Sequence, residues 1–234
     1  MNKWPLLIAS CSIFVGSMPA FANLISNGDF SQSPPSGGCV AGTTSVPGWI
    51  VTTGNVDIIS GYTINPICQS PVGPAGTTYY LDLTGSFAEY GANDVGMIAQ
   101  SFSTATGSRY SVSFYFGGNA GWEVTSYPND GPIKSMNALI NGNLVDTYSV
   151  NTMGVSWTDA QWVAEQFTFT ATSALSTLSF ASGNGISSPS DYGPYLADVQ
   201  VNPAPPSVPE PMTLALLGTG LLAIPFFVKR RRGS

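Results

Sequence analysis

Apolar and polar residues alternate along the middle of the chain. Tyr110, Val112, Phe114 and Phe116 alternate with Ser111, Ser113 and Tyr115. A period of two places one face of a β-strand in a core. Residues 163–171 repeat the period, with Val163, Phe167 and Phe169 on one face. Asn141-Gly142, between the apolar runs 138–140 and 144–150, favours the type I′ turn that joins antiparallel strands.

Other short strands are expected at residues 49–52, 56–59, 78–83, 96–104, 178–180 and 196–201, with turn residues between them. No segment of this region has a convincing amphipathic helical pattern. About nine or ten short strands suggest two packed antiparallel sheets. We therefore predict an all-β domain, an antiparallel β-sandwich of jelly-roll type, over residues 23–201.

The two ends of the chain have the patterns of targeting segments. Residues 1–22 read as a signal peptide, with Lys3 before the apolar stretch 4–15 and Ala20-Phe21-Ala22 as the pattern that signal peptidase cleaves. The mature chain would then begin at Asn23. A lipoprotein box ending at Cys11 is the alternative, but it would leave an apolar region of about five residues, shorter than the usual ~7 to 15.

At the other end, a Pro-rich linker (202–207) precedes Val208, Pro209, Glu210 and Pro211, an apolar run (212–228) and the basic run Lys229–Arg232. As a helix the apolar run would measure roughly 26 Å, near the lower limit for crossing a ~30 Å hydrocarbon core. We expect a C-terminal transmembrane helix whose basic end stays cytoplasmic. An ordinary C-terminal anchor is the alternative reading.

The ending at residues 208–234 resembles the PEP-CTERM sorting signal of Gram-negative bacteria. That resemblance implies export across the inner membrane, processing by an exosortase after signal peptidase, and a place in the cell envelope, at the cell surface or in the extracellular matrix. The inner membrane would hold the chain before processing. Proteins with this signal are usually linked to exopolysaccharide or biofilm.

Charge and residue usage exclude several functions. Residues 23–207 carry twelve acidic residues against Arg109 and Lys134, a net charge of −10. Nucleic acid is excluded as a partner, and neutral glycans, cations or a solvated surface fit better. The chain has no histidine, which removes Ser-His-Asp triads, Cys-His nucleophiles and His-based zinc sites.

Two cysteines remain after export, Cys39 and Cys68. In an oxidising compartment we expect them to form a disulfide. It would tie down the segments 31–48 and 61–76, which are rich in Gly, Pro and Ser and are expected to be loops.

The order of motifs within the domain resembles the choice-of-anchor C family. The motifs are Asn23–Phe30, Pro47-Gly48-Trp49, Val56-Asp57, Leu81-Asp82-Leu83, Ile98–Phe102, Phe167–Thr172, Tyr192-Gly193-Pro194 and Asp198-Val199. The resemblance implies a galactose-binding-like jelly roll that is extracellular, glycan-associated and without established catalytic activity.

Related carbohydrate-binding modules often hold a structural calcium near the first strand, with a Glu after Asn-Gly-x-Phe and an Asp in the last strand. Here Asp198 matches the Asp, whereas Ser31 stands at the Glu position. Asp29 and Asp198 are the candidate ligands, and they supply only some of the six to eight oxygens that calcium takes.

The segment 117–131 has the composition of a sugar site, with aromatic rings and planar polar groups among glycines. The candidate ligand-binding residues are Asn119, Trp122, Glu123, Tyr127, Asn129 and Asp130. The alternative is that these aromatics cap an open end of the sandwich. Tyr62, Tyr90 and Tyr195 are predicted to line the same rim, while Trp49, Trp157 and Trp162 are predicted to lie in the core.

The sequence thus favours an exported non-enzymatic protein that binds, or is embedded in, extracellular polysaccharide. A structural matrix spacer without sugar binding is the alternative. A weak glycoside hydrolase using Glu89, Glu123 or Glu165 is a lesser one; Glu165 is expected on the polar face of its strand.

Overall fold

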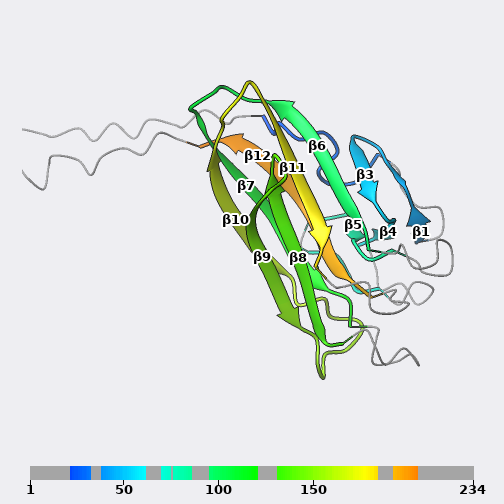
Figure 1. Ribbon diagram of the computed structural model, residues 1–234. Helices are drawn as coiled ribbons and strands as arrows, with labels where there is room; N and C mark the ends of the chain where they lie inside the picture. The colour runs from blue at the N-terminus through cyan, green and yellow to red at the C-terminus, as the bar shows by residue number, and fades with distance from the viewer. Residues whose placement is uncertain are drawn as a thin grey trace, which may run out of the picture.

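A computed structural model describes residues 22–32, 38–61, 70–74, 76–85, 95–120, 131–183 and 192–204. Within them, twelve strands form two six-stranded sheets that pack face to face (Figure 1). The first sheet has the order β1 (Cys39–Thr43), β4 (Val56–Ser60), β5 (Tyr79–Asp82), β12 (Pro194–Pro203), β7 (Arg109–Gly118), β10 (Val163–Thr170). The second has the order β2 (Ser45–Val46), β3 (Trp49–Thr53), β6 (Met97–Ser103), β11 (Leu175–Ser182), β8 (Ile133–Ile140), β9 (Asn143–Asn151). The predicted all-β antiparallel sandwich is confirmed.

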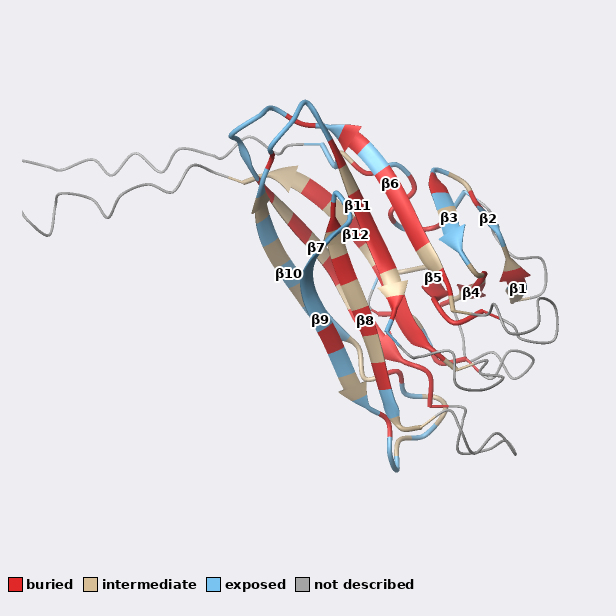
Figure 2. Ribbon diagram, viewed as in Figure 1, coloured by how far each residue is buried: buried red, intermediate tan, exposed pale blue. Residues whose placement is uncertain are grey.

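The core lies between the sheets, where the predicted alternation buries one face of each central strand. Tyr110, Val112, Phe114 and Phe116 of β7 are all buried, as predicted. Phe114 meets Phe180 of β11 edge to face, with ring centroids 4.9 Å apart. Figure 2 shows burial concentrated on the central strands, whereas β9 and β10, at one edge of each sheet, carry exposed residues.

The hairpin turn between β8 and β9 forms as predicted. Asn141 and Gly142 have φ angles of 52° and 78°, the left-handed backbone that a type I′ turn requires at both central positions. The Asn141 side chain also accepts a hydrogen bond from the Thr177 amide at 2.8 Å, which joins the turn to β11.

Two expectations about local structure are wrong. Residues 39–43 and 45–46, expected to belong to a loop, form β1 and β2. Glu165, expected on a polar face, pairs with Phe114 and shares the inner face of β10 with Phe167, because every second residue points the same way. Burial, together with the charges of Asp146 and Glu165, raises the pKa of Tyr148 to about 12.

A second, smaller core covers part of the outer face of the first sheet. It comprises Ile59, Tyr80, Ala160, Tyr195 and Ala197, with Cys39, Tyr115 and Trp162 packed against them. Tyr195, predicted to line an exposed rim, is fully buried and stacks on Trp162 at 5.7 Å. Trp49 is buried as predicted, whereas Trp157 and Trp162 are half-buried.

Two aromatic donors hold the segment 70–74 over this second core. The Tyr80 hydroxyl donates to the Pro71 carbonyl at 2.8 Å, and the Trp162 indole donates to the Val72 carbonyl at 2.9 Å. The outer face of the first sheet is therefore covered around β4 and β5, and the part formed by β12, β7 and β10 is where a groove remains.

In the part of the chain that the structure describes, no helix is long and apolar enough to cross a membrane. Residues 1–21 of the predicted signal peptide lie outside the described residues, as does the predicted span 212–228.

Candidate functional site

A hollow of about 280 Å³ lies on β7, β10 and β12 of the first sheet. Eight residues line it: Ser113, Phe114, Tyr115, Ala164, Glu165, Gln166, Asp198 and Gln200. Ser113 and Tyr115 alternate with the inward-facing Val112 and Phe114, so their side chains face away from the main core. We call this hollow the groove.

Small residues make the groove hollow and leave one aromatic ring standing in it. Strand register places Tyr115 between Ala164 of β10 and Ala197 of β12. Because alanine has no side chain beyond Cβ, neither neighbour covers the ring. Tyr115 is half-buried and packs on one side against the second core, which limits its conformational freedom.

A row of polar side chains crosses the same three strands next to the ring. Gln166, Ser113 and Gln200 lie opposite one another in register. The Gln200 amide nitrogen donates to both carboxylate oxygens of Asp198, at 3.1 and 3.2 Å. The groove thus combines an aromatic ring, two carboxamides, a hydroxyl and a carboxylate, the groups that hold the faces and hydroxyls of a sugar.

Asp198 owes its place in the groove to a β-bulge. The register between β12 and β7 shifts between Ala197 and Gln200, and Asp198 has a φ of 48°. A non-glycine residue in this left-handed conformation costs about 1–2 kcal/mol. Bulges re-aim side chains, and strained residues of this kind cluster at functional sites.

The N-terminal segment fixes the bulge from the other side. The Val199 amide donates to the Gly28 carbonyl at 2.9 Å, and the Asn23 side chain donates to the Val199 carbonyl at 3.1 Å. The Val201 amide in turn donates to Asn23 Oδ1 at 2.8 Å. Two motifs at opposite ends of the domain, Asn23–Phe30 and Asp198-Val199, are therefore one structural unit behind the groove.

Of the predicted sugar-binding segment, the structure describes residues 117–120 and 131. Asn119 is buried and donates its amide to Asp82 Oδ2 at 2.9 Å. Trp122, Glu123, Tyr127, Asn129 and Asp130 lie outside the described residues, so a sugar site there stays a prediction.

Asp82 is the centre of a buried network at the end of the sandwich where Asn119 lies. Its carboxylate also accepts hydrogen bonds from the Thr84 amide at 2.9 Å and the Gly193 amide at 3.3 Å. Asp57 lies directly opposite on β4. Burial, and then the Asp57 charge, raises the pKa of Asp82 well above its usual value.

The predicted calcium ligands lie on segments that touch through the backbone. Asp29 is exposed and accepts hydrogen bonds from the amide and hydroxyl of Ser31 at Oδ1, while Asp198 is held by Gln200. Among the described residues, no three Asp, Glu, Cys or His side chains gather as metal ligands. A structural calcium stays a prediction. Its charged ligands would be the carboxylates of Asp29 and Asp198.

One of the two cysteines of the predicted disulfide lies outside the described residues. Cys39 begins β1 and packs against the second core, whereas Cys68 is not among the described residues. Their pairing stays a prediction.

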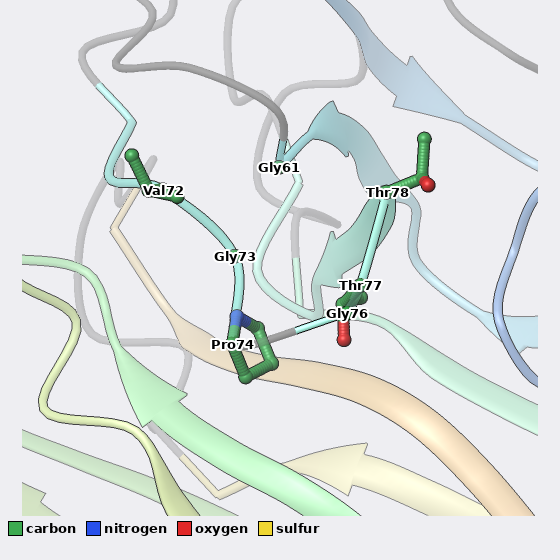
Figure 3. A pocket seen from close by; sticks show the side chains of 7 residues that line it. All are labelled: Gly61, Val72, Gly73, Pro74, Gly76, Thr77 and Thr78. Atoms are coloured by element: carbon green, nitrogen blue, oxygen red, sulfur yellow. The ribbon is translucent and has the colours of Figure 1, made fainter.

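A second hollow, of about 290 Å³, lies beside the segment that Trp162 and Tyr80 hold (Figure 3). Its lining consists of Gly61, Val72, Gly73, Pro74, Gly76, Thr77 and Thr78. None of these seven residues is aromatic or charged. The backbone amides of Gly61, Gly73 and Thr77 already donate to carbonyls of other lining residues. The groove on β7, β10 and β12 is the better site for a polar ligand.

Sequence reasoning named Asp198 and Glu165, for other roles, and missed the remaining residues of the groove. The signal was present, because Tyr115 stands alone among serines on the polar side of a strong alternation. The sequence does not show that β10 and β12 flank β7. This strand order brings Gln166 and Gln200 beside Ser113 and Tyr115.

The fold and the exposed groove define a β-sandwich with a polar, aromatic surface site. Residues 23–202 match the DUF642 family of proteins of unknown function, and the chain belongs to that family. Residues 207–232 match the PEP-CTERM protein-sorting motif, which marks the chain for export to the cell envelope or surface. The narrower choice-of-anchor C assignment stays a prediction.

A curated relative and several solved structures are similar to the chain. Halomucin of Haloquadratum walsbyi is 27% identical over 184 residues, which are 75% of this chain and 2% of halomucin. The chain thus spans a small fraction of that relative's length.

Three similar solved structures are each 16% identical to the chain. The carbohydrate-binding module TmCBM61, solved with β-1,4-galactotriose, has a TM-score of 0.44 and covers 78% of this chain and 99% of its own. A family 35 carbohydrate-binding module from Clostridium thermocellum has a TM-score of 0.40, with 71% and 98% covered. The Stig cyclase Fisc from Fischerella sp. TAU has a TM-score of 0.49, with 80% and 100% covered.

Proposed function

We propose that the chain is an exported, non-enzymatic protein that binds extracellular polysaccharide in the groove. The observation that carries the proposal is Tyr115, whose ring stands between two alanines and beside a row of Gln166, Ser113 and Gln200. A sugar ring can stack on the tyrosine while its hydroxyls exchange hydrogen bonds with the amides. The exopolysaccharide or biofilm matrix of a Gram-negative bacterium, reached after exosortase processing, is the setting we propose.

The positions of the acidic residues favour binding over hydrolysis. A glycosidase needs two carboxyl groups that flank the bond it breaks. The two carboxylates that the described strands place opposite each other are Asp57 and Asp82, and Asp82 is fully buried where a glycan cannot reach it. Two acidic residues line the groove, Asp198 and Glu165. Glu165 shares the inner face of β10 with Phe167, so the two carboxylates do not flank one ligand on the outer face.

The test is affinity electrophoresis of the full-length protein in mild detergent, through gels that contain hydroxyethyl cellulose, galactan, xylan or dextran. We expect retention on at least one of these neutral polysaccharides. Tyr115→Ala should weaken that retention roughly tenfold, because an aromatic anchor at a binding site contributes more than 1 kcal/mol. Tyr115→Phe keeps the ring and should retain most of the binding.

Trp122→Ala is the matched variant for the other candidate site. If it abolishes retention while Tyr115→Ala does not, the sugar site lies in the segment 117–131 instead of the groove. If the wild-type chain is retained on no gel, the spacer function is favoured and the binding proposal is wrong.

A further inference from the structure

The groove is lined by few charged side chains, and all of them are acidic. Two lining residues are acidic, Asp198 and Glu165. The Glu165 side chain lies on the inner face of β10, near Tyr148, so Asp198 is the carboxylate that faces a ligand. The other described charge on this face of β7 is Arg109, whose guanidinium donates to Thr168 at 3.1 Å.

Arg109 is too far away to cancel the Asp198 charge at the groove. It lies four residues before Ser113 on β7, which is roughly 13 Å along an extended strand. Charges that far apart in solvent are largely screened at physiological ionic strength. The groove is therefore locally negative, and the polar side chains that share its outer face with Asp198, namely Ser113, Gln166 and Gln200, are neutral.

The backbone does not require a carboxylate at position 198. In the left-handed conformation of this bulge, asparagine is tolerated at least as well as aspartate and glycine without strain. An asparagine side chain could also accept the hydrogen bond from Gln200. Apart from the predicted calcium ligation, what aspartate alone adds at this position is the negative charge.

We propose that Asp198 makes the groove selective for uncharged glycans and excludes chains that carry carboxylate or sulfate groups. This inference rests on the proposed function, since it describes the selectivity of the same groove. The Asp198 carboxylate accepts hydrogen bonds from the hydroxyls of a neutral sugar, whereas it repels an anionic substituent next to the ring bound at Tyr115. Two carboxamides offer no compensating positive charge.

The experiment compares neutral gels with carboxymethylated gels of the same backbone: hydroxyethyl cellulose with carboxymethyl cellulose, and dextran with carboxymethyl dextran. The quantity measured is the ratio of retention on the charged gel to retention on the neutral gel. Asp198→Asn should raise this ratio roughly two- to fivefold, the size expected for one partly solvated charge contact. Asp198→Gly, which also fits the bulge, should raise it likewise.

Asp146→Asn is the charge-matched control, because Asp146 is exposed on β9 of the other sheet and its removal changes the net charge equally. All variants share the basic run Lys229–Arg232, so its attraction to a charged gel cancels. An unchanged ratio in both Asp198 variants, or an equal change in Asp146→Asn, overturns the selectivity while leaving glycan binding intact. Absence of retention on every neutral gel overturns the proposed function and the selectivity together.

Discussion

Gly28→Ala should destabilise the domain by roughly 3 kcal/mol and abolish retention on neutral polysaccharide gels, although Gly28 does not line the groove. A Cβ atom at position 28 would overlap the carbonyl oxygen of Val199. The carbonyl is part of the backbone and the position of a Cβ atom is fixed by the backbone, so neither can swing away as the end of a long side chain would. The overlap can be relieved only if the N-terminal segment separates from the Asp198-Val199 bulge.

Separation of these segments explains the expected loss of binding. The hydrogen bond from the Val199 amide to the Gly28 carbonyl would break, and the bulge would lose the contact that holds it. The bulge between Ala197 and Gln200 would then rearrange, and both residues would lose their places beside Tyr115 and Ser113. Thermal unfolding measures the first effect, as a fall in Tm of roughly 10 °C, and affinity electrophoresis measures the second.

Gly142→Ala is the control for glycine substitution itself. Gly142 has a φ of 78° in the β8–β9 turn, with no atom near the position of an added Cβ. Its replacement should cost about 1 kcal/mol of conformational strain and leave the groove intact. Equal losses of Tm in the two variants would show that the contact between Gly28 and Val199 does not hold the bulge.

Local patterns in the sequence predict the strands well, because the alternation of apolar and polar residues follows directly from which face of each strand is buried. Phe114 and Val112 lie inward as their alternation predicts, and Asn141-Gly142 forms its turn without help from distant residues. The short strand at residues 39–43 has no such pattern, since Cys39, Val40 and Thr43 depend on pairing with β4. Its formation is a long-range effect that a local pattern cannot report.

The candidate site depends on long-range pairing even more. Gln166, Ser113 and Gln200 are separated by tens of residues in the sequence and meet only because β7 lies between β10 and β12. The expected motif Asp198-Val199 does belong to the site, but its partner is the N-terminal segment. Resemblance identified both motifs, and only the fold shows that they form one unit.

Asp82→Ala should be among the most destabilising substitutions, at about 3 kcal/mol, whereas Asp82→Asn should cost much less. Removing the carboxylate leaves the Asn119 side chain and the Thr84 and Gly193 amides without their acceptor in a buried place. Each buried donor that loses its partner costs about 1–3 kcal/mol. Asparagine keeps one acceptor oxygen and removes a buried charge, so its losses and gains largely offset each other.

The two variants also differ from the wild type in how stability depends on pH. Because burial raises the folded-state pKa of Asp82 well above its usual 3.8, the folded protein binds a proton that the unfolded chain releases. Stability must then fall as pH rises through the window from 3.8 toward the raised pKa, and recover on acidification. Neither Asp82→Asn nor Asp82→Ala can take up this proton, so both lose that part of the pH dependence.

Urea unfolding of the wild type and the variants over a pH range that begins at about 4 measures the difference. The stability of the wild type relative to Asp82→Asn should increase as the pH is lowered. Asp57→Asn provides a further check, because removing the neighbouring charge lowers the Asp82 pKa and moves the window to lower pH. A difference between wild type and Asp82→Asn that stays constant across this range would mean that Asp82 keeps an ordinary pKa, and that its three hydrogen bonds outweigh its burial.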